Sequence, residues 1–261
     1  MPSIKRLAQL KDENRKISMV TAYDYTAARI LNESNVDVLL VGDSASMVMH
    51  GHSTTVHATL EMMAWHTAAV CKGAPDKIVV ADMPFLAHRG SLDTTMDAVN
   101  LLMKAGSTAL KIEGADGSLE TIAHICQSGV PVMGHLGLTP QSVHHLGGHK
   151  VQATNEEEAQ ALIENALALE KAGVFSIVLE CIETSLAKIV TKNIKVPTIG
   201  IGASKYCDGQ ILVFDDLIGL NPMNYKFVKK YANIRKEILN AVLNYSKEVR
   251  KNKFPSKKNS Y

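Results

Sequence analysis

The segment DVLLVGDSAS, residues 37–46, decides the fold class, because a short apolar run ends abruptly in a glycine followed by a carboxylate. Residues 38–41 are apolar at every position rather than at every second one. This pattern is typical of a strand in a parallel sheet, which is buried on both faces. The same junction recurs in KIVVADMPF (77–85), ALKIEG (109–114) and SIVLEC (176–181). The sequence therefore predicts several buried parallel strands, each ending at an acidic residue.

Amphipathic segments separate these apolar runs, as expected for repeated strand–helix units. Residues 60–73 and 95–106 have helical spacing of apolar residues, and each segment ends in a glycine. In residues 155–173, Asn155 is a predicted N-cap, acids fill the first turn, and Gly173 ends the helix. The expected strands are residues 17–22, 36–41, 78–81, 109–112, 130–134, 176–179, 198–200 and 211–214.

Eight strands with seven or eight helices between them predict an α/β fold, namely a single (β/α)₈ barrel of the TIM type. The alternative is an open doubly wound sheet, which normally carries a G-x-G-x-x-G turn after its first strand; MVTAYDYTA (19–27) has none. No linker rich in Pro, Gly or Ser divides the chain. We expect one barrel domain over residues 1–261, with a C-terminal helical extension at 226–250 and a basic tail at 251–261.

Composition excludes several classes of function. The 261 residues carry a net charge of only +2, so no nucleic-acid partner is expected. The four cysteines have no CxxC spacing, which argues against a disulfide framework and a thiolate zinc site. Residues 1–16 lack the apolar core of a signal peptide, and no run of 18 apolar residues could span a membrane. We expect a cytoplasmic protein without a membrane partner.

Parallel barrel strands present all their C-terminal ends at one mouth, where active sites of this fold lie. Four carboxylates gathered there repel one another unless a cation neutralises them, and hard oxygen ligands suit Mg²⁺. Lys111 shares a strand face with Glu113 by the two-residue period and could pair with a carboxylate of the protein or of a substrate. The polar residues that follow the second to sixth expected strands are Asp43, Asp82, Glu113, His135 and Glu180.

Each feature alone has a simpler explanation. An acid after a strand, such as Asp43, is usually a turn former or helix cap, and Lys111 alone would be a structural ion-pair partner. The coincidence at successive strands favours a site. Zinc ligands could come from His50, His52, His57 or the histidines of 144–149, but neither stretch has the helical i, i+4 spacing. The glycines of TIGIGAS (198–204) follow the seventh strand, where barrels often bind phosphate, which is weak evidence on its own.

Seven motifs resemble the ketopantoate hydroxymethyltransferase family in order and spacing, over about residues 17–220. This resemblance implies a (β/α)₈ barrel, and a reaction of 3-methyl-2-oxobutanoate with 5,10-methylenetetrahydrofolate and water that yields 2-dehydropantoate and tetrahydrofolate and requires Mg²⁺. It also implies a ring-shaped homo-oligomer, often a decamer. The motifs are VGDS (41–44), ADMPF (81–85), KIEG (111–114), GHLGLTPQS (134–142), LEC (179–181), IGIGA (199–203) and DGQILV (208–213).

The resemblance also assigns roles to residues. Asp43 and Asp82 match metal-binding aspartates that also contact the substrate, and Glu113 matches a third acid that acts on the metal through a bound water. Ser44 and Lys111 match residues that hold the keto acid. Two further residues complete the matched set, His135 near the substrate and Glu180 as the proton acceptor.

The chain departs from the family pattern at four positions, Ala45, Ser46, Ala115 and Ser204. Glycine is usual at the last three, so these departures bear on backbone flexibility around Ser44 and near Ser204. Two rival functions share the fold. One is a Mg²⁺-dependent keto-acid lyase or mutase of the phosphoenolpyruvate type, which often uses a loop cysteine; Cys181 and Cys207 lie in other contexts. The second is a catalytically silent ligand-binding barrel, which is expected to have lost the charged residues that this chain keeps.

Overall fold

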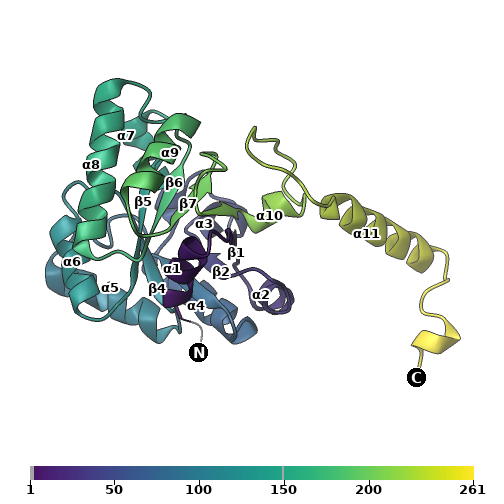
Figure 1. Ribbon diagram of the computed structural model, residues 1–261. Coiled ribbons are helices and arrows are strands. Elements are labelled where there is room, and N and C mark those ends of the chain that lie inside the picture. The colour runs from purple at the N-terminus through teal and green to yellow at the C-terminus, as the bar shows by residue number, and fades with distance from the viewer. Residues whose placement is uncertain (1–2, 149) are drawn as a thin grey trace. The chain divides into compact units, whose positions relative to one another are not determined.

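The computed structural model describes residues 3–148 and 150–261 and divides the chain into two compact units, Met1–Leu212 and Val213–Tyr261. In the first unit eight parallel strands close into a barrel in the order β1 to β8 (Figure 1). This confirms the predicted fold class. The strands are β1 (Ile17–Thr21), β2 (Val38–Val41), β3 (Ile78–Asp82), β4 (Ala109–Glu113), β5 (Val132–Gly137), β6 (Ser176–Glu180), β7 (Thr198–Ile201) and β8 (Gly209–Leu212).

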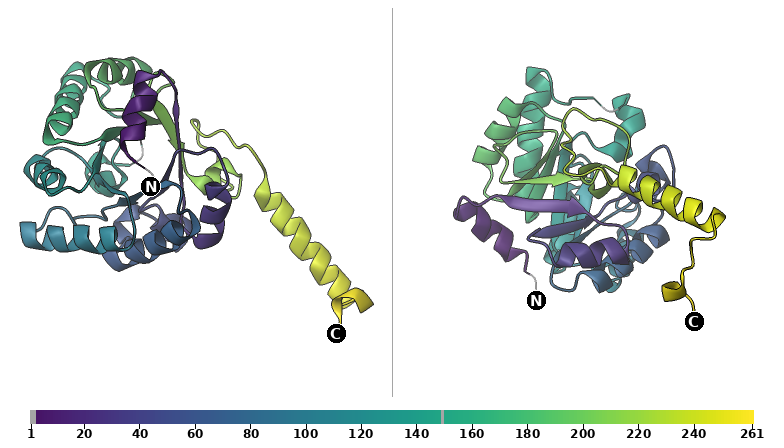
Figure 2. Two further views of the ribbon diagram at one scale, coloured as in Figure 1. Left: turned by 60° about the horizontal axis from the view of Figure 1, so that its bottom comes forward. Right: turned by 90° about the vertical axis from the view of Figure 1, so that its right-hand side faces the viewer.

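Helices surround the strands of the first unit, as two further views show (Figure 2). Between β7 and β8 the chain runs through residues 202–208, a connection without a helix. The helices are α1 (Lys5–Asp12), α2 (Tyr25–Asn32), α3 (Ala45–Val48), η1 (Thr55–His57), α4 (Leu60–Gly73), α5 (Leu92–Lys104), α6 (Leu119–Gln127), η2 (Pro140–Ser142), α7 (Val143–Leu146), α8 (Glu156–Ala172) and α9 (Thr184–Asn193).

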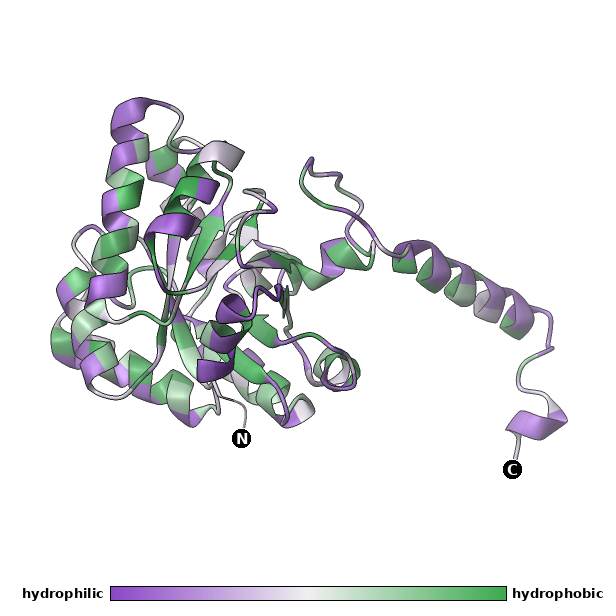
Figure 3. Cartoon of the chain, viewed as in Figure 1, coloured by the Kyte–Doolittle hydropathy of each residue, from purple (hydrophilic) through white to green (hydrophobic). Residues whose placement is uncertain are grey.

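Helix boundaries follow the predicted signals. The Asn155 side chain accepts a hydrogen bond from the Glu158 backbone N–H at 2.9 Å, which caps α8. Gly173 ends that helix with φ at 101°, a conformation that glycine adopts without strain. Helix α8 alternates between hydrophilic and hydrophobic residues, in agreement with one buried and one solvent-facing side (Figure 3). No helix in residues 3–148 or 150–261 is long and apolar enough to cross a membrane.

All eight predicted strands are present, and β5 and β8 differ from their predicted bounds by two or more residues at both ends. Strand β5 spans Val132–Gly137 rather than 130–134, because Pro131 has no backbone N–H for the sheet, so His135 lies inside the strand. Strand β8 starts at Gly209 instead of residue 211, and Phe214 already belongs to a helix. A Cβ at position 209 would lie 2.6 Å from the Ile17 carbonyl oxygen, so only glycine allows this approach to β1.

The second unit contains α10 (Phe214–Leu217), α11 (Ile234–Arg250) and η3 (Lys257–Asn259). Helix α11 starts at Ile234, later than the predicted residue 226, because the Asn233 side chain caps the Lys236 backbone N–H there. Phe227, inside the predicted range, therefore precedes the helix, whereas the apolar residues Ile238 and Val242 lie on it and are exposed, at 49% and 58%.

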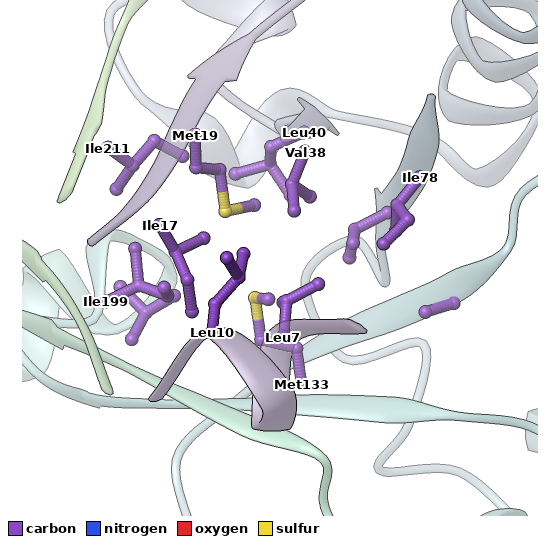
Figure 4. Packing of buried hydrophobic residues seen from close by; sticks show 13 residues of the cluster. Leu7, Leu10, Ile17, Met19, Val38, Leu40, Ile78, Met133, Ile199 and Ile211 are labelled. Carbon is purple, nitrogen blue, oxygen red and sulfur yellow. The ribbon is translucent and has the colours of Figure 1, made fainter. Parts of the chain in front are cut away.

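Apolar side chains fill the barrel interior at the N-terminal ends of the strands. Two leucines of α1, Leu7 and Leu10, insert among them and are 0% and 2% exposed (Figure 4). The α1 helix thus closes this end of the barrel, and any charged site is left to the opposite end. The strand residues of this cluster are Ile17, Met19, Val38, Leu40, Ile78, Val80, Ala109, Met133, Val178, Ile199 and Ile211.

Candidate active site

The two-residue period of the strands carries the side chains from the apolar interior to a charged layer. Asp82 is the last residue of β3, and Glu113 is the last residue of β4. Register places Asp82 beside Lys111 and Glu113 beside His135 on neighbouring strands. Because Lys111 and Glu113 are two residues apart on one strand, they lie on the same face. These four side chains are all buried, each at most 5% exposed.

Asp43 reaches the same cluster from the turn after β2. Its backbone N–H donates to Asp82 Oδ2 at 2.9 Å, so the acid of β3 fixes the start of this turn. Gly42 leaves room for that contact, since a Cβ there would meet Ser44 Oγ at 2.7 Å and Asp82 Oδ2 at 3.6 Å. The predicted convergence of the acids from β2 and β3 is therefore present in the structure.

Lys111 and His135 form the positive centre of the cluster. Lys111 Nζ lies 3.0 Å from Asp82 Oδ1 and 3.4 Å from Glu113 Oε1. His135 Nδ1 lies 3.1 Å from Glu113 Oε1, and its Nε2 lies 3.2 Å from Glu180 Oε2. His135 thus joins the β4 acid to the β6 acid, and Glu180 keeps 15% of its side chain exposed.

The charges in this cluster shift one another's pKa values. Burial alone would lower the pKa of Lys111, but Asp82, Glu113 and Asp43 raise it above its usual value, so the ammonium stays charged. Burial would raise the pKa of Glu113, but Lys111 and His135 lower it to about 2. Burial and Lys111 would lower the pKa of His135, but Glu113 and Glu180 raise it to about 9. The two acids favour the imidazolium form of His135, whereas the Lys111 ammonium, 3.1 Å from its Nδ1, opposes it.

The two aspartates experience the opposite effect. Burial raises the pKa of Asp43 well above its usual value, and the charges of Asp82 and Glu113 raise it further. Burial also raises the pKa of Asp82, with Glu113 adding to the effect and Lys111 opposing it. The cluster holds four acids against two cations, so full ionisation leaves two negative charges. A divalent cation would neutralise that excess.

The residues fit a Mg²⁺ site of the open kind, in which one or two carboxylates bind the ion and substrate and water complete its shell. Asp82 Oδ1 is buried and accepts no hydrogen bond from the described residues, although it faces Lys111. Both oxygens of Glu113 accept hydrogen bonds, whereas Asp82 accepts one only at Oδ2, and this difference suits a water-mediated role for Glu113. Across residues 3–148 and 150–261, no group of three or more His, Cys, Asp or Glu side chains is arranged to hold a metal ion by itself.

Two site residues were missed by sequence reasoning. Tyr23, just beyond the end of β1, places its hydroxyl 2.9 Å from Ser44 Oγ, and so orients a serine predicted to hold the keto acid. Gln141, in η2, donates from Nε2 to Asp43 Oδ2 at 2.8 Å. Position after a strand could have indicated Tyr23. Gln141 lies inside the GHLGLTPQS motif, but no spacing rule connects it with an aspartate 98 residues away.

The backbone around Glu180 is tightly constrained. Gly137 at the end of β5 has φ at 90°, and a Cβ there would lie 2.2 Å from the Glu180 carbonyl oxygen. The next residue, Leu138, donates its N–H to that oxygen at 2.8 Å. Cys181 also has positive φ, at 47°, and burial raises the pKa of its thiol to about 11. The thiol next to Glu180 is therefore protonated at neutral pH and is a poor nucleophile.

The histidine-rich stretches do not join the charged cluster. His50 Nε2 lies 2.9 Å from His66 Nε2, and His52 stacks on His57. These contacts give pairs, and within the described part of the chain no group of three or more such side chains could hold a metal ion. Of the 144–149 group, residue 149 lies outside the described residues.

The departures from the family pattern introduce no backbone strain. None of the four residues is among the described non-glycine residues with positive φ, so none of them needs the freedom of glycine. Ala45 and Ser46 lie buried in α3, where Ser46 Oγ donates to the Thr54 carbonyl oxygen at 3.0 Å.

The fold is shared with enzymes of other activities. A phosphonopyruvate hydrolase solved in complex with oxalate and Mg²⁺ superposes with a TM-score of 0.63 at 12% identity, covering 99% of this chain and 93% of that chain. A 2,3-dimethylmalate lyase of the PEP mutase/isocitrate lyase superfamily gives a TM-score of 0.62 at 15% identity, covering 100% of this chain and 92% of that chain. At such identities these structures share the barrel fold with this chain and carry no evidence of its activity.

Sequence relatives are much closer. A protein named 3-methyl-2-oxobutanoate hydroxymethyltransferase from Bdellovibrio bacteriovorus is 51% identical to this chain over 100% of both chains. A protein of the same name from Legionella pneumophila is 48% identical to it over 96% of this chain and 97% of the relative. The model of the family described as ketopantoate hydroxymethyltransferase matches residues 2–257. The resemblance carried by the seven motifs is thereby confirmed, and the chain belongs to the ketopantoate hydroxymethyltransferase family.

Proposed function

We propose that this chain transfers a hydroxymethyl group from 5,10-methylenetetrahydrofolate to 3-methyl-2-oxobutanoate, which yields 2-dehydropantoate and tetrahydrofolate. The relatives' name and the family match support this reaction. The structural observation that carries it is the buried cluster at the barrel mouth, where four acids surround Lys111 and His135 with two negative charges in excess. Such a cluster suits a divalent cation together with an anionic keto acid.

Asp43 and Asp82 would hold Mg²⁺, with Glu113 acting through a bound water. When bound, Mg²⁺ would supply Lewis-acid stabilisation of the negative charge that develops on the keto oxygen as the C3 proton leaves. The raised pKa values of Asp43 and Asp82 support this assignment, because a nearby cation removes the repulsion that disfavours their ionised forms.

Lys111 and Ser44 would hold the substrate carboxylate. The pKa of Lys111 is raised, so its ammonium keeps a positive charge for that ion pair. Ser44 is oriented by the Tyr23 hydroxyl at 2.9 Å. Two fixed donors would align the keto acid with its C3 atom toward β6, and such alignment lowers the barrier by reducing the entropy lost in the reaction.

Glu180 would accept the C3 proton. Among the four acids of the cluster, Glu180 is the one that lies on the Nε2 side of His135, at 3.2 Å, and its side chain is 15% exposed. The pKa of His135 is raised to about 9, which favours its imidazolium form, so it would orient Glu180 through Nε2 and would not itself take a proton. Once the proton has left, the substrate C3 carbon can form its bond to the folate-borne methylene carbon. Water then supplies the hydroxyl oxygen as the bond between that carbon and the folate nitrogen breaks, and the nitrogen takes up a proton to give tetrahydrofolate.

A keto-acid lyase or mutase is the second candidate, favoured only by the shared barrel. Enzymes of that type often use a reactive cysteine, whereas burial raises the pKa of Cys181 to about 11 and also raises that of Cys207. A silent binding barrel would have lost its charged mouth, which this chain retains. The cytoplasmic location and the homo-oligomer remain predictions from the sequence.

The direct test is to incubate the protein with 3-methyl-2-oxobutanoate and 5,10-methylenetetrahydrofolate, with and without Mg²⁺. Mass spectrometry then measures the 2-dehydropantoate that has formed. We expect folate-dependent product that disappears when EDTA removes the cation. Cleavage of the keto acid without folate would favour the lyase. Binding without any turnover would favour the silent barrel.

A further inference from the structure

Gln141 is the buried residue that connects three strand ends of the mouth without being an acid or a base. It lies in η2, on the connection between β5 and α8, and is 5% exposed. Its Nε2 donates to Asp43 Oδ2 at 2.8 Å and to the Met83 carbonyl oxygen at 2.9 Å. Its backbone N–H donates to Glu113 Oε2 at 3.0 Å. One residue thus contacts the acid after β2, the chain after β3 and the acid of β4.

The side-chain amide can take only one orientation here. A primary amide nitrogen has two hydrogens, and both are used, one on Asp43 and one on Met83. Rotating the amide by half a turn would place its oxygen against two acceptors, which is unfavourable. Position 141 therefore requires two donors, which a glutamate of the same shape cannot supply in its ionised form.

As a result, one of the two carboxylate oxygens of Asp43 already accepts a hydrogen bond within the protein. Oδ2 accepts from Gln141, whereas Oδ1 accepts no hydrogen bond from the described residues. A hydrogen bond to one oxygen fixes the plane of the carboxylate and thereby the direction of the free oxygen. Partners of this kind commonly determine the affinity of a metal site from outside it.

We propose that Gln141 is a positioning residue that holds Asp43 Oδ2 and so presents Oδ1 to the divalent cation and the keto acid. This inference rests on the proposed function, because it assumes that Asp43 meets the cation. Since the backbone N–H of Gln141 also holds Glu113, the η2 turn sets the spacing between the β2 and β4 acids.

The test separates this role from a purely structural one. Gln141→Met keeps an unbranched chain of similar volume and keeps the backbone N–H on Glu113, but removes both side-chain donors. Calorimetric titration with 3-methyl-2-oxobutanoate in Mg²⁺ and in EDTA measures the cation-dependent part of binding. We expect that part to weaken by about 10–100-fold, while binding in EDTA stays close to wild type. The melting temperature should fall by only a few degrees, because two buried acceptors lose their donors.

A matched control is Gln160→Met on the outer surface of α8, where the same amide-to-carboxylate bond, 2.8 Å to Glu164 Oε1, is exposed. This control should bind as wild type does. A second variant, Gln141→Glu, places carboxylate oxygens against Asp43 Oδ2 and Met83, and should weaken cation-dependent binding at least as much; it decides the matter if Gln141→Met does not fold.

Wild-type affinity in either variant, or an equal loss with Mg²⁺ and with EDTA, would overturn the positioning role. Failure of the proposed function would look different, because wild type itself would then show neither Mg²⁺-dependent keto-acid binding nor turnover.

Discussion

The two ends of the barrel are built by the same strands yet differ completely in chemistry. At the N-terminal end, Leu7 and Leu10 of α1 pack among apolar strand residues and leave no charged side chain in the cluster. At the C-terminal end, Asp82, Lys111 and Glu113 are equally buried but charged. Burial is therefore not what distinguishes the two ends. One end is stabilised by removal of apolar surface, whereas the other holds charges that only their mutual pairing, and a cation, can neutralise.

A single strand shows how abrupt the change is. In β4, Ala109 belongs to the apolar cluster, and Lys111 and Glu113 follow it on the same face at intervals of two residues. The apolar layers are therefore free to vary in detail as long as they fill the barrel. The charged layer is constrained residue by residue, and the following predictions exploit that difference.

The largest effect is expected from removing a proposed metal ligand. Asp43→Asn or Asp82→Asn should weaken Mg²⁺-dependent binding of 3-methyl-2-oxobutanoate by more than the ~10–100-fold typical of residues that act from outside a metal shell. Calorimetric titration in Mg²⁺ measures this directly. Glu113→Gln should lose less affinity, because its proposed contact with the cation runs through water. Unchanged Mg²⁺-dependent affinity in both aspartate variants would remove them from the metal site.

A truncation at the opposite end should act on stability alone. Leu10 is 2% exposed, so Leu10→Ala should reduce the free energy of unfolding by about 2–5 kcal/mol through lost burial and the cavity left behind. Urea unfolding measures the loss, and turnover per folded molecule at low temperature should match wild type. A fall in turnover of the folded enzyme would show that the two ends are coupled, contrary to this account.

The charged end should also give the metal-free protein a pH dependence. The pKa of His135 is raised from 6.5 to about 9, so binding of its proton stabilises the folded protein. This stabilisation is fully present below pH 6.5 and is lost as the pH rises through 9. The loss should amount to roughly 3 kcal/mol in the free energy of unfolding, measured by urea titrations between pH 6 and 10 in EDTA. His135→Gln should have a flatter profile over this range; an identical slope would place the titration elsewhere.

The smallest effect is expected at a position where the chain departs from its family. Ser46→Gly restores the usual residue but removes the hydrogen bond to the Thr54 carbonyl oxygen and places glycine in a helix. We expect a loss of about 1 kcal/mol in the free energy of unfolding, with unchanged turnover. A gain in turnover would indicate that Ser46 restricts a motion that the site needs.

Much of this arrangement could be predicted from the sequence because strands carry strong local signals. Apolar runs such as 38–41 and 176–179, and helix caps such as Asn155, identified the barrel and its order. Because all strands of a parallel barrel end at one mouth, the sequence also predicted that Asp82, Glu113 and Glu180 lie there together. The roles assigned to them in catalysis stay predictions.

Contacts that depend on three-dimensional packing could not be predicted from the sequence. Gln141 meets Asp43 across 98 positions of sequence, and no periodicity relates a turn after β5 to a turn after β2. The protonated state of His135 depends on two acids from neighbouring strands, and only their distances reveal it. Strand β5 was displaced by two residues because Pro131 interrupts hydrogen bonding in a way that hydrophobicity alone does not show.

The central claim is that Glu180 removes the C3 proton of the keto acid. Proton NMR in D₂O can follow exchange at C3 of 3-methyl-2-oxobutanoate with enzyme and Mg²⁺ but without folate, since proton removal precedes formation of the carbon–carbon bond. Glu180→Gln keeps the shape of the side chain and removes its basicity, so exchange should fall by about 10²–10⁴-fold while keto-acid affinity stays near wild type. Equal exchange rates in the two enzymes would contradict the account.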